Sequence, residues 1–189
     1  KKYKTDKLPP QSGQLFRKIE LNNVSFRYPD ISEDALKKIS FEVNSGESIG
    51  LIGTSGSGKT TLAYALERRL FDQGRSAMVV DGQNLRLGLN KDLGFSQEDR
   101  SENLRRTVEV SRLLNAAGMI SICAFVAPNR AIRQRFREAF PQDQFMLVHL
   151  AAPIEVCRER DSEGMYAKAE SGEVENFPGV SIEYEPPRN

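Results

Sequence analysis

The sequence lacks an excess of charge of either sign. Its 27 basic and 26 acidic residues leave a formal net charge of +1 over 189 residues. Proteins that bind nucleic acid or membrane surfaces through their overall field carry a larger imbalance. Long apolar runs are also absent, since each falls short of the roughly 18 residues that a membrane span requires. We therefore expect neither nucleic acid nor a membrane as a partner, and any phosphate recognition must be local.

Cysteine and histidine are scarce. Cys123 and Cys157 have no C-x-x-C spacing, so reduced thiols in a cytosolic setting are favoured over a disulfide or a zinc site. The single histidine, His149, lies in a strand-like run without a second metal-ligand residue at a useful spacing. A packed strand residue is therefore favoured over a metal ligand. The polar, basic N-terminus carries no visible signal peptide, and a cytoplasmic location is expected.

A glycine-rich loop organises the chain. The stretch from Gly53 to Thr60 fits the pattern G-x-x-x-x-G-K-[ST], with an apolar run before it and a helix-forming run at 61–70 after it. An ordinary Gly/Ser connection is disfavoured because the fixed positions and both flanks agree. Lys59 is expected to reach the β- and γ-phosphates of ATP, and Thr60 to ligate Mg²⁺. The other expected nucleotide-binding residues are Gly53, Ser55, Gly56, Ser57 and Gly58 of this stretch and Thr61 directly after it.

Short strand patterns define the expected fold. Buried strands are predicted to start near Ser48, Ser76, Met119 and Phe145, with helices at 97–117 and 153–161. Two alternating runs, 19–28 and 36–43, predict antiparallel N-terminal strands. We therefore predict a three-layer α/β P-loop fold with a mainly parallel sheet. Residues 1–14 are polar, contain two prolines, and are predicted to form a flexible arm.

Residues 19–62 resemble the opening of an ABC-transporter nucleotide-binding domain. The resemblance is carried by IELNNVSFRYPD and ALKKISFEVNSGESIGLIGTSGSGKTTL. In that family an aromatic residue at the place of Tyr28 stacks on adenine, and packing at a strand end explains Tyr28 equally well. The family's L-S-G-G-Q signature, its apolar strand ending in Asp-Glu and its switch histidine are absent downstream. ABC-type function is therefore not supported.

From about residue 55 to 189 the chain resembles adenylylsulfate (APS) kinase. The shared segments are DGQNLRLGLNKDLGFSQEDRSENLRR, AFVAPNRAIRQ, PIEVCRERD and GMYAKAESGEVENFPGVSIEYEPP. Because the P-loop suits both families, we predict a chimera joined near it, with an ABC-like part at 15–62 and a kinase part at 55–189. The kinase part lacks the family's last strand and helix, which leaves a sheet edge uncovered unless the N-terminal strands cover it. This resemblance implies transfer of the γ-phosphoryl group of MgATP to the 3′-hydroxyl of adenylylsulfate.

Asp81 follows a strand, at the sheet end where α/β folds bind ligands, so we expect it to meet the substrate hydroxyl or the Mg²⁺ shell. A simple turn after a strand is the alternative. The family's usual D-G-D-N motif reads D-G-Q-N here, so Gln83 removes one acidic ligand. Many members carry Ser where Ala127 stands, and Ala127 favours direct in-line transfer. The substrate positions that the resemblance implies are Asn84, Arg86, Phe95, Arg100, Asn103, Val126, Ala127, Lys168 and Phe177.

Arg160 is implied as a further nucleotide contact, and it lies with Lys168 in a segment that resembles the family's lid. A plain basic helix face is the alternative for this segment, and core packing is the alternative for Phe95 or Phe177 taken alone. Two other functions stay open: a nucleotide-binding module with little turnover, and an ABC-type ATPase that needs a partner chain. A homodimer is one possible assembly.

Overall fold

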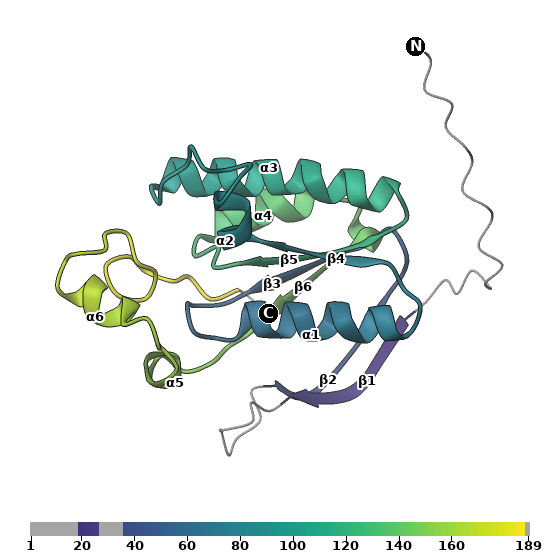
Figure 1. The fold of residues 1–189 in the computed structure, drawn as a ribbon, viewed down its shortest axis with the longest axis horizontal. Coiled ribbons are helices and arrows are strands. Elements are labelled where there is room, and N and C mark those ends of the chain that lie inside the picture. Colours follow the sequence, from purple (N-terminus) through teal and green to yellow (C-terminus); the bar gives the residue numbers. More distant parts are fainter. Residues whose placement is uncertain (1–18, 27–35, 188–189) are drawn as a thin grey trace, which may run out of the picture.

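The computed structural model describes residues 19–26 and 36–187, and it is built around a parallel sheet of four strands (Figure 1). The strands lie in the order β4-β5-β3-β6. Their bounds are β3 Ser48–Ile52, β4 Ala77–Asp81, β5 Ile120–Phe125 and β6 Phe145–His149. All three neighbouring pairs are parallel. The predicted α/β P-loop fold with a parallel sheet is confirmed.

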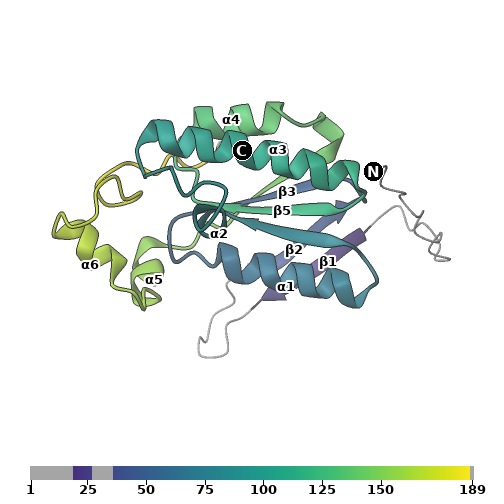
Figure 2. The ribbon, with the colours of Figure 1, turned by 45° about the horizontal axis from the view of Figure 1, so that its top comes forward.

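Helices cover both faces of this sheet (Figure 2). α1 (Lys59–Asp72) lies on one face, and α3 (Gln97–Ala116) and α4 (Arg130–Glu138) lie on the other. The shorter helices are α2 Gly82–Arg86, η1 Gln142–Gln144, α5 Ile154–Glu159 and α6 Met165–Glu170. Among the described residues, none of the helices combines the length and apolar character needed to cross a membrane.

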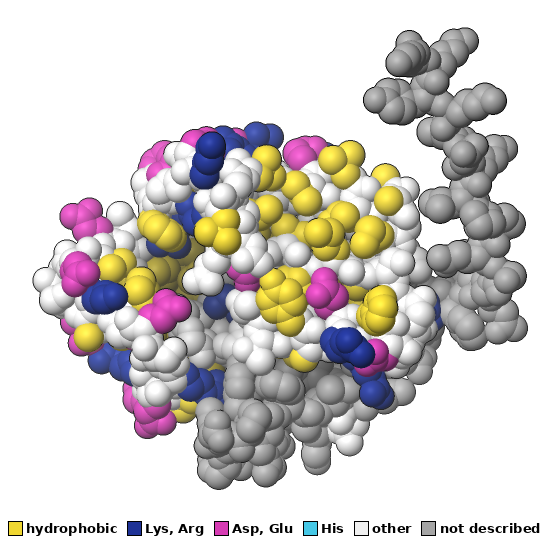
Figure 3. Space-filling model, in the orientation of Figure 1, with side chains coloured by type: hydrophobic (Ala, Val, Ile, Leu, Met, Phe, Trp, Pro, Cys, Tyr) yellow, Lys and Arg dark blue, Asp and Glu magenta, His cyan; other side chains and the backbone are white. Residues whose placement is uncertain are grey.

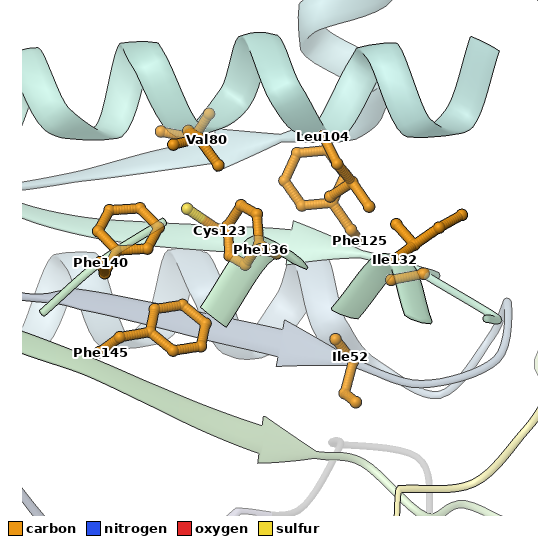
Figure 4. Packing of buried hydrophobic residues seen from close by; sticks show 11 residues of the cluster. Ile52, Val80, Leu104, Cys123, Phe125, Ile132, Phe136, Phe140 and Phe145 are labelled. Atoms are coloured by element: carbon orange, nitrogen blue, oxygen red, sulfur yellow. The ribbon is translucent and has the colours of Figure 1, made fainter. Parts of the chain in front are cut away.

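Two apolar cores hold the layers together. On the α1 face, Ile49 and Leu51 of β3 pack with Leu66 and Leu70. On the opposite face, the rings of Phe136, Phe140 and Phe145 form one cluster, with centroids 5.2–5.5 Å apart (Figure 4). A Cβ atom at Gly50 would lie 2.9 Å from the Phe145 ring, so a side chain there would displace the packed rings. Both faces of β3 are thus buried, as its continuous apolar run predicts.

The two N-terminal strands form a sheet of their own. β1 (Ile19–Phe26) pairs antiparallel with β2 (Leu36–Val43), and the pair lies on the α1 side of the large sheet (Figures 1 and 2). Val43, at the end of β2, joins the core on that side. Within residues 19–26 and 36–187 the pair adds no strand to the large sheet. In the part of the chain that the structure describes, these strands therefore do not cover an edge of the large sheet.

Edge strand β4 has one of its backbone groups capped by a side chain. The Val79 N–H donates a 2.7 Å hydrogen bond to Glu67 Oε1 on α1. At the far end of the strand order, β6 carries His149, whose ring stacks on Tyr184 with centroids 5.9 Å apart. Burial lowers the pKa of His149, so the ring is neutral at physiological pH. The interpretation of His149 as a packed strand residue is confirmed.

Candidate functional site

The P-loop bends through three glycines in conformations that side chains disfavour. Their φ angles are +152° at Gly53, +76° at Gly56 and +92° at Gly58. A Cβ atom at Gly56 would lie 2.6 Å from the carbonyl oxygen of Cys157, and one at Gly53 would lie 2.7 Å from that of Leu150. The loop therefore packs directly against the chain after β6, and its glycines are required for space as well as for conformation.

Lys59 is the buried cation of the loop. It is 8% exposed, and its Nζ donates a 2.7 Å hydrogen bond to the carbonyl oxygen of Thr54. Burial lowers the pKa of Lys59 to about 8, and the neighbouring Cys157 and Asp81 partly offset this effect. A desolvated ammonium group with one backbone partner is suited to binding an anion, because a phosphate would restore the charge stabilisation that burial removes.

Thr60 and Asp81 form a pair of oxygen groups beside Lys59. The Thr60 hydroxyl donates a 2.7 Å hydrogen bond to Asp81 Oδ2, and the Gln83 N–H donates one of the same length to Asp81 Oδ1. Asp81 is 4% exposed and caps α2. Hydroxyl and carboxylate oxygens are the ligands that Mg²⁺ prefers, and Mg²⁺ needs few protein ligands when phosphates and waters supply the rest. The residues present therefore fit a nucleotide-bound Mg²⁺.

A cavity of about 620 Å³ joins these groups to the predicted substrate residues. In the space-filling view, the surface is hollowed between the lobe that carries α5 and α6 and the body that carries the sheet (Figure 3). The predicted residues that line the cavity are Ser55, Gly56, Gly58, Lys59, Thr60, Thr61, Asp81, Arg86, Phe95, Arg100, Asn103, Val126, Ala127, Arg160 and Phe177. Residues predicted to bind the nucleotide and residues predicted to bind the substrate thus line the same pocket.

Two guanidinium groups and one ring form the wall farthest from the P-loop. The guanidinium carbon of Arg86 lies 4.4 Å, and that of Arg100 5.5 Å, from the Phe95 ring centroid. Arg86 donates to the Leu93 carbonyl oxygen at 2.7 Å, and Arg100 bridges the carbonyl oxygens of Phe95 and Asn176. Burial lowers the pKa of Arg100, and the adjacent Arg86 lowers it further. Two neighbouring cations favour an anion between or beside them.

Phe177 approaches the pocket from the opposite lobe. It is 7% exposed and packs edge-on against Tyr166 of α6, with ring centroids 5.0 Å apart. The Tyr166 hydroxyl donates a 2.8 Å hydrogen bond to the carbonyl oxygen of Ser55 in the P-loop. Burial raises the pKa of Tyr166 to about 12, so the hydroxyl keeps its proton. The lobe that carries Phe177 is therefore fastened to the phosphate loop through Tyr166.

The loop after β5 is held in a strained conformation. Ala127 has φ +40°, which is unusual for a residue other than glycine. Arg133, 5% exposed, donates a 2.6 Å hydrogen bond to the Ala127 carbonyl oxygen and another to that of Glu185. The Glu185 N–H donates a 3.0 Å hydrogen bond to the carbonyl oxygen of Pro128. The segment near residue 185 therefore supports this wall of the pocket.

Some predicted residues are not brought to the cavity. Gly53 and Ser57 lie in the P-loop but do not line the pocket, and the exposed Lys168 lies on α6 outside the lining. Asn84 instead donates a 2.7 Å hydrogen bond to the Tyr64 hydroxyl of α1. Tyr28 lies outside the described residues. Their predicted roles stay predictions.

Sequence reasoning missed Tyr166, Arg133 and Asn90. Tyr166 and Arg133 lie within segments that carry the kinase resemblance, but each occupies a helical position whose direction depends on tertiary packing. Asn90 lies in the connection from α2 to α3 and is fully buried. No local sequence pattern distinguishes these three buried polar residues from the exposed polar residues around them.

The chain is similar to known adenylylsulphate kinases. The adenylylsulphate kinase family model matches residues 45–189. The adenylyl-sulfate kinase of Shewanella pealeana is 55% identical over 135 residues, which cover 71% of this chain and 66% of that protein. The structure of the Mycobacterium tuberculosis APS kinase CysC in complex with AMPPNP and APS aligns with a TM-score of 0.74 and 41% identity, covering 77% of this chain and 85% of that one.

A longer relative also matches the chain. The bifunctional enzyme CysN/CysC of Rhodopirellula baltica is 49% identical over 166 residues, which cover 85% of this chain but 26% of that enzyme. The chain thus spans about a quarter of this relative and slightly under two thirds of the Shewanella kinase. A match over 85% of the chain reaches into the residues before 45. These matches give no support to the predicted ABC-transporter segment or to a chimera. The chain belongs to the adenylylsulphate kinase family.

Proposed function

We propose that the protein transfers the γ-phosphoryl group of MgATP to the 3′-hydroxyl of adenylylsulfate, giving 3′-phosphoadenylylsulfate. The observation that carries this proposal is that one pocket is lined both by the P-loop and by Arg86, Phe95 and Arg100. The related Mycobacterium tuberculosis kinase forms a complex with AMPPNP and APS, which supports the pairing of a nucleotide and adenylylsulfate in such a pocket.

At the P-loop end, the chain's own groups would hold the phosphates. Lys59 would exchange its bond to the Thr54 carbonyl oxygen for contacts with the β- and γ-phosphates. Thr60 and Asp81 would hold Mg²⁺, which when bound neutralises charge on the phosphate oxygens. Because both Asp81 oxygens already accept hydrogen bonds, the carboxylate is fixed in position before any ligand binds.

The transfer itself needs little covalent chemistry from the protein. The 3′-oxygen forms a bond to the γ-phosphorus, and the bond from that phosphorus to the β–γ bridging oxygen breaks. The proton of the hydroxyl passes to an acceptor, for which Asp81 is our candidate because it lines the pocket beside Lys59. Ala127 has no hydroxyl that a covalent route would use, so we propose direct in-line transfer.

At the far end, charge and shape suit an adenylylsulfate. Arg86 and Arg100 would bind phosphosulfate oxygens, because guanidinium forks match such groups. Phe95 and Phe177, which enter the pocket from different elements, would enclose the adenine between aromatic faces. Arg160 lines the pocket and is proposed as a contact of the ATP. A cytoplasmic location, a homodimer and the roles of Tyr28, Asn84 and Lys168 stay predictions.

A coupled assay of ADP formation tests the proposal. We expect ADP to form only when MgATP and adenylylsulfate are both present. Intact binding of MgATP without ADP formation dependent on adenylylsulfate would favour the second candidate, a nucleotide-binding module with little turnover. Gln83 and Ala127, which depart from the family pattern, are the observations that favour that candidate. ADP formation from MgATP alone would point instead to an ATPase.

A further inference from the structure

One amide in the pocket wall has different surroundings at its two ends. Asn103 of α3 is 5% exposed, and its Oδ1 accepts a 2.5 Å hydrogen bond from Asn90 Nδ2. Its Nδ2 donates to no group among the residues that the structure describes, and the residue lines the pocket. The donor end of the Asn103 amide is therefore the end presented to a ligand.

Asn90 lies behind this amide, in the connection between α2 and α3. It is fully buried, its N–H donates to the Leu85 carbonyl oxygen at 2.8 Å, and its carbonyl oxygen accepts from the Leu93 N–H at 3.1 Å. The backbone therefore fixes where the Asn90 side chain starts. An amide side chain can still turn by half a rotation, which exchanges donor and acceptor without changing its shape. A second neighbour must decide between the two orientations.

Arg106 is the neighbour that selects the orientation of the Asn90 amide. Its Nη1 lies 3.5 Å from Asn90 Oδ1, and a guanidinium group offers donors alone. Turning the Asn90 amide would place its NH₂ group against this cation. Arg106 is held in place by a double hydrogen bond to Asp92, both distances 2.7 Å, and by a 2.9 Å bond to Glu102. Even at 3.5 Å, the sign of the charge favours the observed orientation of Asn90.

We propose that Asn90 is a positioning residue that, with Arg106, holds the Asn103 amide with its donor toward the pocket to bind an acceptor atom of the nucleotide substrate. The nature of that substrate rests on the proposed function. Adenylylsulfate offers phosphosulfate and ribose oxygens and adenine nitrogens as acceptors. A ligand without an acceptor at this point would leave a nearly buried donor unpaired, so the amide contributes to specificity as well as affinity.

The substitution Asn90→Asp tests the polarity directly. A carboxylate has the same shape but no donor, so Asn103 would turn to donate its Nδ2 to it and would present Oδ1 to the pocket. We expect the KM for adenylylsulfate to rise on the order of tenfold to a hundredfold, because a favourable contact becomes a repulsive one. The KM for ATP should stay unchanged. Calorimetric titration of adenylylsulfate into the protein with ADP present should give the same loss without relying on turnover.

A double-mutant cycle separates positioning from a general structural role. When Asn103→Ala is already present, Asn90→Asp should cause no further rise in the KM for adenylylsulfate, because the amide that it orients is gone. An equal rise in both backgrounds overturns the proposal. If Asn90→Asp does not fold, Arg106→Gln replaces it, with Arg105→Gln as the matched control. Arg105 is exposed and pairs with Glu102, and within the described part of the chain it makes no hydrogen bond to Asn90.

Arg106→Gln should raise the KM for adenylylsulfate several-fold, by about threefold to tenfold, and Arg105→Gln should not. If the wild-type protein binds adenylylsulfate and Asn90→Asp leaves the KM for adenylylsulfate unchanged, the positioning role is overturned. The proposed function is then unaffected. Wild-type protein that binds ADP but gives no adenylylsulfate-dependent heat or ADP formation overturns both. A KM for ATP that rises in parallel also overturns the positioning role, because it indicates distortion of the whole pocket.

Discussion

The two ends of the pocket are built in different ways. At the P-loop end, Lys59 is 8% and Asp81 4% exposed. Asp81 is the last residue of β4, and Lys59 begins α1 after the loop that follows β3. At the far end, Phe95 is 57% exposed and lies in the connection between α2 and α3. The groups proposed to bind phosphate are therefore held by the core of the fold, whereas the ring of Phe95 lies on its surface. Substitutions that change the P-loop backbone should alter folding and binding together, and a substitution at Phe95 should alter binding alone.

The largest expected effect is that of Lys59→Met. Loss of this cation should lower kcat/KM by about 10²–10³-fold, because a charge beside the transferring phosphoryl group is removed. Stability should hold or increase, since burying the charged Lys59 opposes folding. Steady-state kinetics and denaturant unfolding measure the two quantities. Lys91→Met, at an exposed lysine, is the control and should change neither.

A second prediction compares two glycines with similar backbone conformations. Gly56 has φ +76° and Gly74 has φ +72°, so alanine at either position should cost about 1–2 kcal/mol of stability through strain. The Gly56→Ala methyl group would also lie 2.6 Å from the Cys157 carbonyl oxygen, whereas nothing lies within 4 Å at Gly74. Gly56→Ala should therefore lose about 1–3 kcal/mol more, the usual cost of overpacking, and should also weaken ATP binding. If thermal unfolding shows equal losses of stability for the two variants, the P-loop can shift to relieve its contact with the chain after β6.

Phe95→Ala should affect the substrate end alone. We expect the KM for adenylylsulfate to rise about tenfold, because an aromatic contact with the base is lost. The free energy of unfolding should change by less than about 0.5 kcal/mol, as is usual for an exposed side chain. Leu87→Ala, at a residue 84% exposed and outside the lining, is the control. A parallel loss of ATP affinity in Phe95→Ala would contradict the separation of the two ends.

The smallest expected effect is a proton linkage at Lys59. Its pKa is about 8 when buried, and phosphate should raise it, so nucleotide binding at about pH 8.5 should take up protons. Calorimetry in two buffers of different ionisation enthalpy measures this uptake, and Lys59→Arg should remove it. In the ligand-free protein the unfolded chain binds more protons than the folded one between pH 8 and 10.5. The contribution of Lys59 to stability therefore rises with pH across that window.

Strands, the P-loop and the family were accessible from the sequence, because each leaves a local pattern. The buried runs near Ser48 and Phe145 fall within the strands that form. Ser96 and Asn129 cap α3 and α4 with their side chains, residue types that favour this position. The P-loop helix begins at Lys59, two residues before the prediction, because Gly58 already turns the chain into it. Boundaries of this kind depend on single dihedral angles, which a pattern of apolar residues does not fix.

The contacts that complete the site are long-range, and the sequence does not specify them. Tyr166 reaches Ser55 across 111 positions, and Arg133 reaches Glu185 across 52. Asn84 likewise makes a contact that no local pattern indicates, a hydrogen bond to the Tyr64 hydroxyl of α1, and its predicted role stays a prediction. The expected chimera, to which the matches give no support, rested on a pattern of a similar kind. A strand followed by a P-loop is common to both families, so resemblance near residue 50 did not identify the source of the segment before it.

The hydrogen bond between the Val79 N–H and Glu67 affects how copies of the chain can associate with one another. An edge strand with free backbone groups is a template on which other chains assemble into extended sheets. Glu67 places a carboxylate on that edge and occupies one of its donors. An incoming strand would have to displace a charged group before it could pair. The helix that begins at the phosphate loop thus also protects the protein against self-association through β4.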